Sequence, residues 1–299
     1  MLLSIWPGMS QPWADIADTA RFADAGGWHC LYVEDHFFDG DHPEQPLHEA
    51  TAALAALAAL TSRIRLAPLV LSVTHRHPAV VANWAVTLDH ISAGRLTLGI
   101  GAGWAQDEHT AYGLALGSPK ERVDRFAEGL AVIDGILHHP PYTTSGTYYQ
   151  VSEATAPPGP AGERIPLLIG AKGERMLGLV ARYADEWNAW STPELLAGFT
   201  ARLDAACDRA GRDPATLHRS TQAEIKLTTN DAEAAAFRAA ASPRAAVTGS
   251  ADQIAEQLAR YAEAGADEFI VLTESFGGRS EREDALAALW EATAAVRGW

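Results

Sequence analysis

The sequence predicts an α/β protein, a single (β/α)8 barrel of the TIM type that occupies residues 1–299 as one domain. Three observations predict this fold. Apolar strand-like segments alternate with amphipathic or Ala-rich helix-like segments along the whole chain. Eight such strand–helix units can be counted, and a TIM barrel consists of eight units in about 250 residues or more. Residues 63–109 form a complete strand, helix and strand unit, which implies two parallel strands joined by a crossover helix.

That unit shows how the elements are recognised. Its first strand is almost continuously apolar from Ile64, as in parallel strands that are buried on both faces. Pro78 opens the helix at a position where a missing amide does no harm, and Gly94 ends it. The second strand runs from Leu96 into the glycine-rich turn 99–103. By the same criteria the eight predicted strands are Leu2–Trp6, Trp28–Val33, Ile64–Leu69, Leu96–Ile100, Pro166–Ile169, Ala184–Asn188, His218–Leu227 and Glu268–Leu272.

Two segments exceed the eightfold repeat and are predicted insertions. Trp104–Ser118 follows the fourth strand, and His139–Arg164 precedes the fifth. The second insertion contains a β-hairpin pattern around Ser145-Gly146. Near the C-terminus, Ser250-Ala-Asp-Gln253 is a capping-box pattern that opens a helix. The Ala-rich segment 231–249 has no apolar stripe, and we expect a mobile helix or partial disorder there.

Composition excludes several function classes. The net charge of −15, without a Lys/Arg cluster, would repel nucleic acid and anionic lipid. No uninterrupted apolar run reaches the length of a membrane span, and the N-terminus lacks an export signal, so we expect a cytoplasmic protein that acts on a small molecule. Cys30 and Cys207 have neither zinc-site nor CxxC spacing and are expected to be buried thiols.

Function in such a barrel lies at the carboxyl ends of the strands. Four tryptophans are predicted there: Trp6, Trp104, Trp187 and Trp190. Any one of them could simply cover the barrel core, but four together favour a cavity for a flat aromatic ligand.

Polar residues follow the second strand at the same end. Alternation places Glu34 and His36 on one face of an extended chain and Asp35 on the other. His36 is the best acid/base candidate, since imidazole titrates near neutral pH and a neighbouring carboxylate can orient it and hold its charge. The alternative is a histidine that caps a helix or braces a loop.

The segment after the fifth strand has the composition of a phosphate-binding turn. Gly170 and Gly173 leave backbone amides unencumbered where a helix begins, and Lys172 and Arg175 add positive charge. The segment matches neither a Walker loop nor the full GxGxxG spacing, so an ordinary glycine turn is the alternative.

We expect no catalytic metal. The residues that could bind one are Glu34, Asp35, His36, Asp39, Asp41 and His42, together with the pair His75 and His77. The first group surrounds Gly40 in what is typical of a solvated loop, and His77 precedes a helix-opening proline.

Taken together, the motifs make the chain similar to the bacterial-luciferase-like superfamily of flavin- and deazaflavin-dependent barrel oxidoreductases. The opening Ser4-Ile-Trp-Pro-Gly8 resembles the branch that uses coenzyme F420. The other matching segments are Val33-Glu-Asp-His-Phe37, His77-Pro78, Leu88 to Leu96, Leu98 to Trp104, Glu108-His109, Tyr112-Gly113, Pro166 to Gly170 and Ala181 to Asn188.

The resemblance implies a tricyclic ring in the barrel mouth, with its phosphate near the ends of the fourth and fifth strands. It implies a non-prolyl cis peptide at Ser72-Val73 behind the ring, and it places Asp35 and His36 beside the ring as the catalytic pair. The implied cofactor-binding residues are Trp6, Asp35, Ser72, Val73, Ala102, Gly103, Trp104, Asp107, Gly170, Ala171, Lys172, Gly173 and Arg175, and the substrate pocket is formed by Trp104, Trp187 and Trp190.

The sequence departs from the family at one informative position. Relatives that oxidise sugar phosphates carry a glutamate where this chain has Trp104, so that proton donor and that substrate are not carried over. The first hypothesis is an F420-dependent oxidoreductase that transfers hydride to or from a small organic substrate. The alternatives are an FMN-dependent luciferase-like monooxygenase and a non-catalytic flavin-binding protein. The resemblance also predicts a homodimer that packs through helices including Glu49–Leu60.

Overall fold

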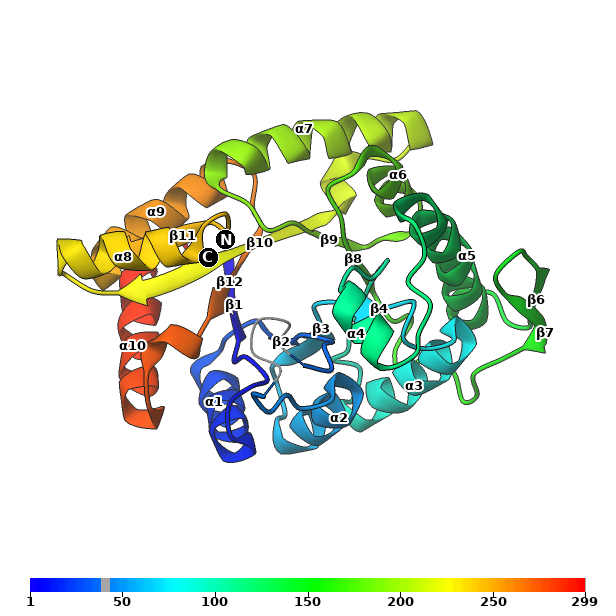
Figure 1. Cartoon of the computed structure of the whole chain (residues 1–299), viewed down its shortest axis with the longest axis horizontal. Helices are drawn as coiled ribbons and strands as arrows, with labels where there is room; N and C mark the ends of the chain where they lie inside the picture. Colours follow the sequence, from blue (N-terminus) through cyan, green and yellow to red (C-terminus); the bar gives the residue numbers. More distant parts are fainter. Residues whose placement is uncertain (39–43, 299) are drawn as a thin grey trace.

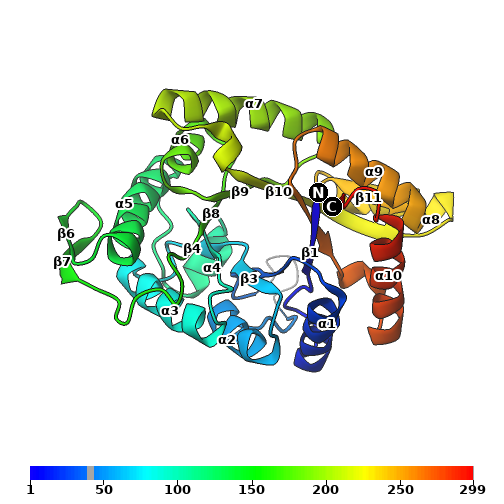
Figure 2. The ribbon, with the colours of Figure 1, turned by 180° about the vertical axis from the view of Figure 1, so that it is seen from behind.

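The computed structural model describes residues 1–38 and 44–298, and it forms a barrel of parallel strands with helices outside it (Figures 1 and 2). The barrel strands are β1 (Leu2–Trp6), β2 (Cys30–Val33), β3 (Arg65–Pro68), β4 (Leu71–Ser72), β5 (Leu98–Gly101), β8 (Leu167–Gly170), β9 (Glu186–Asn188), β10 (His218–Leu227) and β12 (Glu268–Leu272). The order of paired strands is β3-β2-β1-β12-β10-β9-β8-β5-β4. A parallel bridge between Leu66 of β3 and Leu96, just before β5, closes the barrel between β3 and β5.

The helices are α1 (Trp13–Gly26), α2 (Ala50–Leu60), α3 (Pro78–Ile91), α4 (Gln106–Ala111), α5 (Pro119–His138), α6 (Glu174–Tyr183), α7 (Pro193–Ala210), α8 (Asp231–Ala241), α9 (Ala251–Glu263) and α10 (Arg279–Ala292), with single 3-10 turns at Pro214–Thr216 and Glu274–Phe276. The capping box predicted at Ser250 is present at the start of α9. None of the helices formed by the described residues has the length and apolar character needed to cross a bilayer.

The eight predicted strands are all present, and the first, seventh and eighth have the predicted bounds. The third predicted strand, Ile64–Leu69, corresponds to β3, and residues 69–70 then separate β3 from the short strand β4, which lies beyond the predicted bounds. This interruption lies at the carboxyl end of the barrel and shapes the site described below.

Strand alternation separates two apolar clusters. Leu31 and Val33 of β2 belong to the large cluster between strands and helices. Their neighbour Tyr32 belongs to a small cluster inside the barrel with Ala67, Leu168 and Ile270, which are all fully buried. The barrel interior is therefore filled by side chains below the mouth.

Both predicted insertions contain regular structure. The first holds the short helix α4, and the second holds the antiparallel hairpin β6 (Tyr142–Ser145) and β7 (Gln150–Ala154). A helix is present in 231–249, as the first of the two expectations for that segment had it. That segment forms α8 and a missed strand, β11 (Ala246–Gly249), which pairs with residues 224–227 of β10. The extra length of β10 beyond the barrel provides the edge that β11 needs.

The two ends of the chain meet. The Met1 amino group donates to the carbonyl of Val296 at 3.0 Å, and the N and C labels lie together in both views (Figures 1 and 2). Cys30 and Cys207 are free and buried, as predicted.

Candidate functional site

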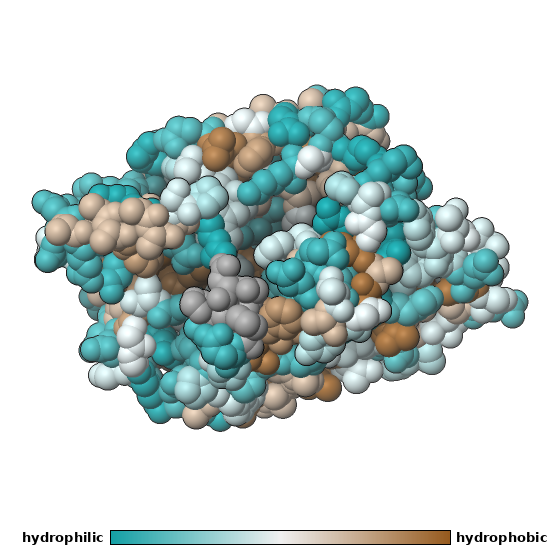
Figure 3. Space-filling view, in the orientation of Figure 1, coloured by the Kyte–Doolittle hydropathy of each residue, from teal (hydrophilic) through white to brown (hydrophobic). Residues whose placement is uncertain are grey.

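The candidate site is a cavity of about 460 Å³ at the carboxyl ends of the barrel strands. Four of the residues that line it are the last residues of their strands: Trp6 of β1, Gly170 of β8, Asn188 of β9 and Leu272 of β12. The molecule is hollowed near the centre of this face (Figure 3). A smaller cavity of about 140 Å³ adjoins it. The two share the residues His36, Leu69, Val70, Trp104, Ala105 and Glu108.

The wall between the cavities is built around Leu69-Val70, whose peptide bond is cis. Glycines make room for it, since a Cβ on Gly101 would lie 2.6 Å from a methyl of Val70, and one on Gly99 would overlap the carbonyl oxygen of Pro68. Gly170 also faces the Val70 side chain. The glycine-rich turn seen in the sequence thus allows the interrupted third strand to bulge into the mouth.

The predicted cis peptide at Ser72-Val73 is therefore wrong by three residues. Residues 72 and 73 continue the sheet, because Ser72 pairs with Gly101 and the Val73 amide donates to the Gly101 carbonyl at 3.0 Å. Ser72 lines the smaller cavity, whereas the Val73 side chain is buried and lines neither.

Asp35 lies on the inner side of the smaller cavity and is 5% exposed. Arg76 donates to both carboxylate oxygens at 2.8 and 2.9 Å, and the Ser72 amide donates to Oδ2 at 2.9 Å. His75 Nδ1 lies 3.3 Å from the same oxygen. Burial raises the pKa of Asp35, but the bonds from His75, Arg76 and Ser72 and the charge of Arg76 lower it to about 2. Asp35 is a fixed, charged group that holds the segment after β4.

His36 points into both cavities from the end of β2. Its Nδ1 lies 3.1 Å from both carboxylate oxygens of Glu108, and the Trp104 ring meets it edge-on at 5.4 Å. Burial lowers the pKa of the imidazole, but Glu108, with smaller contributions from Glu34 and Asp35, raises it above its usual value. The carboxylate that orients His36 is thus Glu108, whereas Asp35 faces Arg76 on the other side of the chain, as strand alternation predicts.

Glu108 also anchors the chain around His36. It is 2% exposed, and its Oε1 accepts the Phe37 amide at 2.7 Å. Hydrogen bonds from His36 and from the backbone lower the pKa of Glu108 despite its burial, which raises that pKa. Sequence reasoning missed this residue as a site member. The available signal was its place in the polar run 106–109 directly after the fourth strand.

Three of the four predicted tryptophans line the larger cavity: Trp6, Trp104 and Trp190. Trp6 meets Trp190 edge-on at 6.1 Å and donates its indole N–H to Glu34. Trp104 is 71% exposed. Trp187 does not belong to this group. It is fully buried and lines neither cavity, and its N–H donates to the Ala171 carbonyl at 2.8 Å.

Glu34 is not among the predicted cofactor or substrate residues, but it lines the larger cavity beside Trp6. Its second oxygen accepts the Met9 amide at 2.6 Å. As alternation predicts, Glu34 and His36 face this cavity, whereas Asp35 lines only the smaller one.

The predicted phosphate-binding turn leads from β8 into α6. Gly170 lines the larger cavity, and Gly173 is the N-cap of α6, whose first amides donate to no capping side chain. Lys172 is exposed, and its Nζ lies 5.8 Å from the Phe199 ring. Although the residue as a whole is exposed, partial desolvation of its amine lowers the pKa of Lys172. Arg175 is paired with Asp124.

The remaining predicted residues are placed as follows. Gly103 lines the smaller cavity and Asp107 the larger one, while Ala102, Ala171, Lys172, Gly173 and Arg175 line neither. A side chain on Gly103 would collide with the hydroxyls of Ser72 and Thr74, and its φ of +78° favours glycine.

None of the described residues at this mouth forms a metal-binding group. His75 packs against Asp35, and the His77 side chain caps α3. Asp39, Asp41 and His42 lie outside the described residues. The one group of three potential ligands among the described residues lies elsewhere in the barrel.

A comparison with protein families matches residues 3–242 to the family described as luciferase-like monooxygenase. The chain belongs to this family. Among the curated proteins, it is 32% identical over 202 residues to an F420-dependent glucose-6-phosphate dehydrogenase of Microbacterium testaceum, a match that covers 66% of this chain and 60% of the relative. The matches span between 50% and 60% of the length of three such dehydrogenases.

Solved structures of the luciferase-like fold extend over nearly the whole chain. An F420-dependent secondary alcohol dehydrogenase, solved with an F420-acetone adduct, superposes with a TM-score of 0.85 at 18% identity and covers 96% of this chain and 98% of its own. A monooxygenase from Streptomyces bottropensis superposes with a TM-score of 0.82 at 20% identity over 100% of both chains. These likenesses confirm the predicted barrel.

Proposed function

We propose that this luciferase-like protein is an oxidoreductase that uses coenzyme F420 to transfer hydride to or from a small organic substrate. One observation carries the proposal. His36 Nδ1 is held by Glu108, while its Nε2 has no hydrogen-bond partner among the described residues and its side chain is 30% exposed at the shared cavity wall. The names of relatives from the curated proteins and the solved structures support the choice of cofactor.

The residues present fit this cofactor. Leu69-Val70 and the side chain of Trp104 supply apolar surface for a flat ring in the larger cavity. The uncapped start of α6, with Lys172 beside it, would hold the phosphate, because free amides and a positive helix end attract anions. Lys172 forms no ion pair with any described residue, so its charge is available to a ligand. When bound, a deazaflavin supplies hydride chemistry at one ring carbon.

The side chains of the mouth then have separate tasks. His36 exchanges a proton through Nε2 with a substrate oxygen or nitrogen, and Glu108 orients the ring and favours its protonated form. Asp35 positions the Ser72 segment and takes no part in proton transfer, since its carboxylate is occupied and stays charged. Trp6, Trp104 and Trp190 exclude water from the substrate.

The first experiment compares cofactors. The apoprotein is titrated with F420 and, separately, with FMN, and tryptophan fluorescence quenching gives both dissociation constants. We expect F420 to bind more tightly. Tighter binding of FMN would overturn the cofactor choice and favour the second candidate, an FMN-dependent monooxygenase, which the family description and the Streptomyces structure support.

The second experiment tests His36. His36→Gln should bind F420 as the wild type does but lower the single-turnover rate by about 100-fold, the usual contribution of a positioned acid/base group. The matched control is His90→Gln, which replaces an exposed histidine whose Nε2 contacts the Gly159 carbonyl on the surface. An unchanged rate in His36→Gln would remove His36 from the chemistry. Candidate alcohols, aldehydes, enones and imines are screened with oxidised or reduced cofactor, and no turnover above the free-cofactor rate would favour a non-catalytic binding protein.

A further inference from the structure

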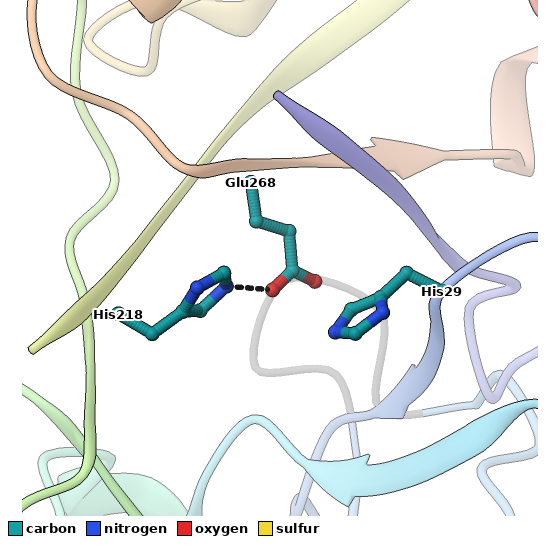
Figure 4. A group of neighbouring side chains, drawn as sticks. All are labelled: His29, His218 and Glu268. Atoms are coloured by element: carbon teal, nitrogen blue, oxygen red, sulfur yellow. Dashed lines mark hydrogen bonds and ion pairs between the residues drawn. The ribbon is translucent and has the colours of Figure 1, made fainter. Parts of the chain in front are cut away.

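A second polar cluster lies at the amino ends of the strands, the opposite end of the barrel from the candidate site. His29 directly precedes β2, His218 is the first residue of β10, and Glu268 is the first residue of β12. Figure 4 shows the three side chains pointing toward one another between their strands. One potential ligand atom from each lies within 4.8 Å of the other two.

The contacts within this cluster leave atoms that could still bind a metal ion. His218 Nε2 lies 2.7 Å from Glu268 Oε2, and the Tyr32 hydroxyl donates to Oε1 at 3.0 Å. No described residue hydrogen-bonds to the His29 ring, whose centroid lies 6.1 Å from that of His218. Glu268 is fully buried, whereas both histidines are only partly buried, so solvent reaches the cluster from the histidine side.

We propose that His29, His218 and Glu268 bind a divalent transition-metal ion of the Zn²⁺ type. Two imidazoles and one carboxylate suit zinc, whereas Mg²⁺ and Ca²⁺ prefer oxygen ligands alone. Tetrahedral zinc at about 2.0 to 2.2 Å from each ligand atom requires these atoms to lie roughly 3.3 Å apart. The observed limit of 4.8 Å is close enough for side-chain rotations alone to complete the site. A water molecule takes the fourth position on the solvent side.

The surroundings suit a ligand carboxylate. Metal-bound carboxylates in proteins are generally hydrogen-bonded by a neighbouring group, and Tyr32 already does this for Glu268. The ion would join β2, β12 and β10, which are close in the strand order β2-β1-β12-β10. It would therefore link the first strands of the chain to the last and stabilise the barrel, independently of the proposed redox function.

The test uses untagged, full-length protein that has been treated with EDTA and then titrated with Zn²⁺ against a chromophoric chelator. We expect one zinc per chain with a dissociation constant in the micromolar range or below. His29→Gln should weaken binding by roughly 100-fold, since one of three ligands is lost. The matched control is His139→Gln, whose histidine is exposed and lies 3.8 Å from Asp134, so that a surface histidine beside a carboxylate is removed.

A thermal readout complements the titration. Zinc at a hundredfold excess over its dissociation constant should raise the Tm of the wild type by about 4 °C but leave that of His29→Gln unchanged. Absence of zinc uptake by the wild type, or uptake that His139→Gln weakens as much as His29→Gln does, would overturn the proposal. Should His29→Gln fail to fold, wild-type crystals soaked in Zn²⁺ decide, and an anomalous peak away from His218 and Glu268 would also overturn it.

Discussion

Replacement of Asp35 by asparagine should destabilise the protein while leaving the contact between His36 and Glu108 in place. The pKa of Asp35 lies at about 2 against an ordinary 3.8, because Arg76, His75 and the Ser72 amide stabilise its charged form within a buried site. A tenfold change in the protonation equilibrium is worth about 1.4 kcal/mol at 25 °C. The lowered pKa therefore corresponds to about 2 kcal/mol of folding free energy at neutral pH, and Asp35→Asn removes this charge.

The sign of the pH dependence follows from the lowered pKa. The contribution of Asp35 is fully present above the unfolded pKa near 4 and is lost as the pH falls toward about 2. The stability difference between wild type and Asp35→Asn should thus be constant from pH 7 to pH 5 and shrink below pH 4. Urea denaturation, followed by tryptophan fluorescence, should show a midpoint lowered by about 0.7 M at pH 7 if the slope is about 3 kcal/mol/M.

Two further variants distinguish the loss of the ion pair between Asp35 and Arg76 from the effect of removing any carboxylate. Arg76→Gln should also destabilise, and the double variant should cost less than the sum of both, because the two residues share bidentate hydrogen bonds. Asp124→Asn, which removes the partly exposed partner of the exposed Lys120 and Arg175, should leave the midpoint unchanged. An Asp35→Asn protein with the midpoint of the wild type at pH 7 would refute the reasoning.

Three other predictions follow from the same geometry. Gly101→Ala should lower the urea midpoint markedly and weaken cofactor binding, since its Cβ would press on Val70, whereas Gly178→Ala, with nothing within 4 Å, should not lower the midpoint. Glu108→Gln should lower the pKa of His36, because the substitution removes the carboxylate charge that raises this pKa. NMR titration of the imidazole proton measures it, and an unchanged pKa would contradict the expectation. The predicted homodimer should dissociate in Val80→Glu, since Val80 is 61% exposed on α3 beside α2, and light scattering that finds equal masses for both proteins would count against this interface.

The barrel could be predicted from sequence because its signals are local. Buried parallel strands are short apolar runs, and caps such as Ser250 mark helix starts within four residues. Segment 231–249 could not be predicted in this way, since β11 forms only because β10 extends past the barrel and offers a free edge. Strand formation there depends on a partner 22 residues earlier in the chain.

The site could be predicted only in part, because some of its contacts join residues that are distant in the sequence. Alternation within β9 explains the error at Trp187, because Asn188 faces the cavity and its neighbour must then face the helices. The same rule placed His36 correctly. Its partner Glu108 lies 72 residues along the chain, and no local pattern specifies that contact. The three-residue error in the position of the cis peptide also arises from a contact distant in sequence. The bulge lies where Gly99 and Gly101 leave space on the neighbouring strand.

Glu34 and Asp35 precede His36 in the chain and Glu108 contacts it, and each of these three carboxylates holds a different piece of backbone. Glu34 accepts the Met9 amide, Asp35 the Ser72 amide and Glu108 the Phe37 amide. An acceptor that is committed to fixed donors is poorly suited to exchange protons, because losing its charge would break those bonds. His36 retains an open nitrogen, and it is therefore the group at this mouth where substitution should change rate more than stability, whereas substitution of the three carboxylates should change stability first.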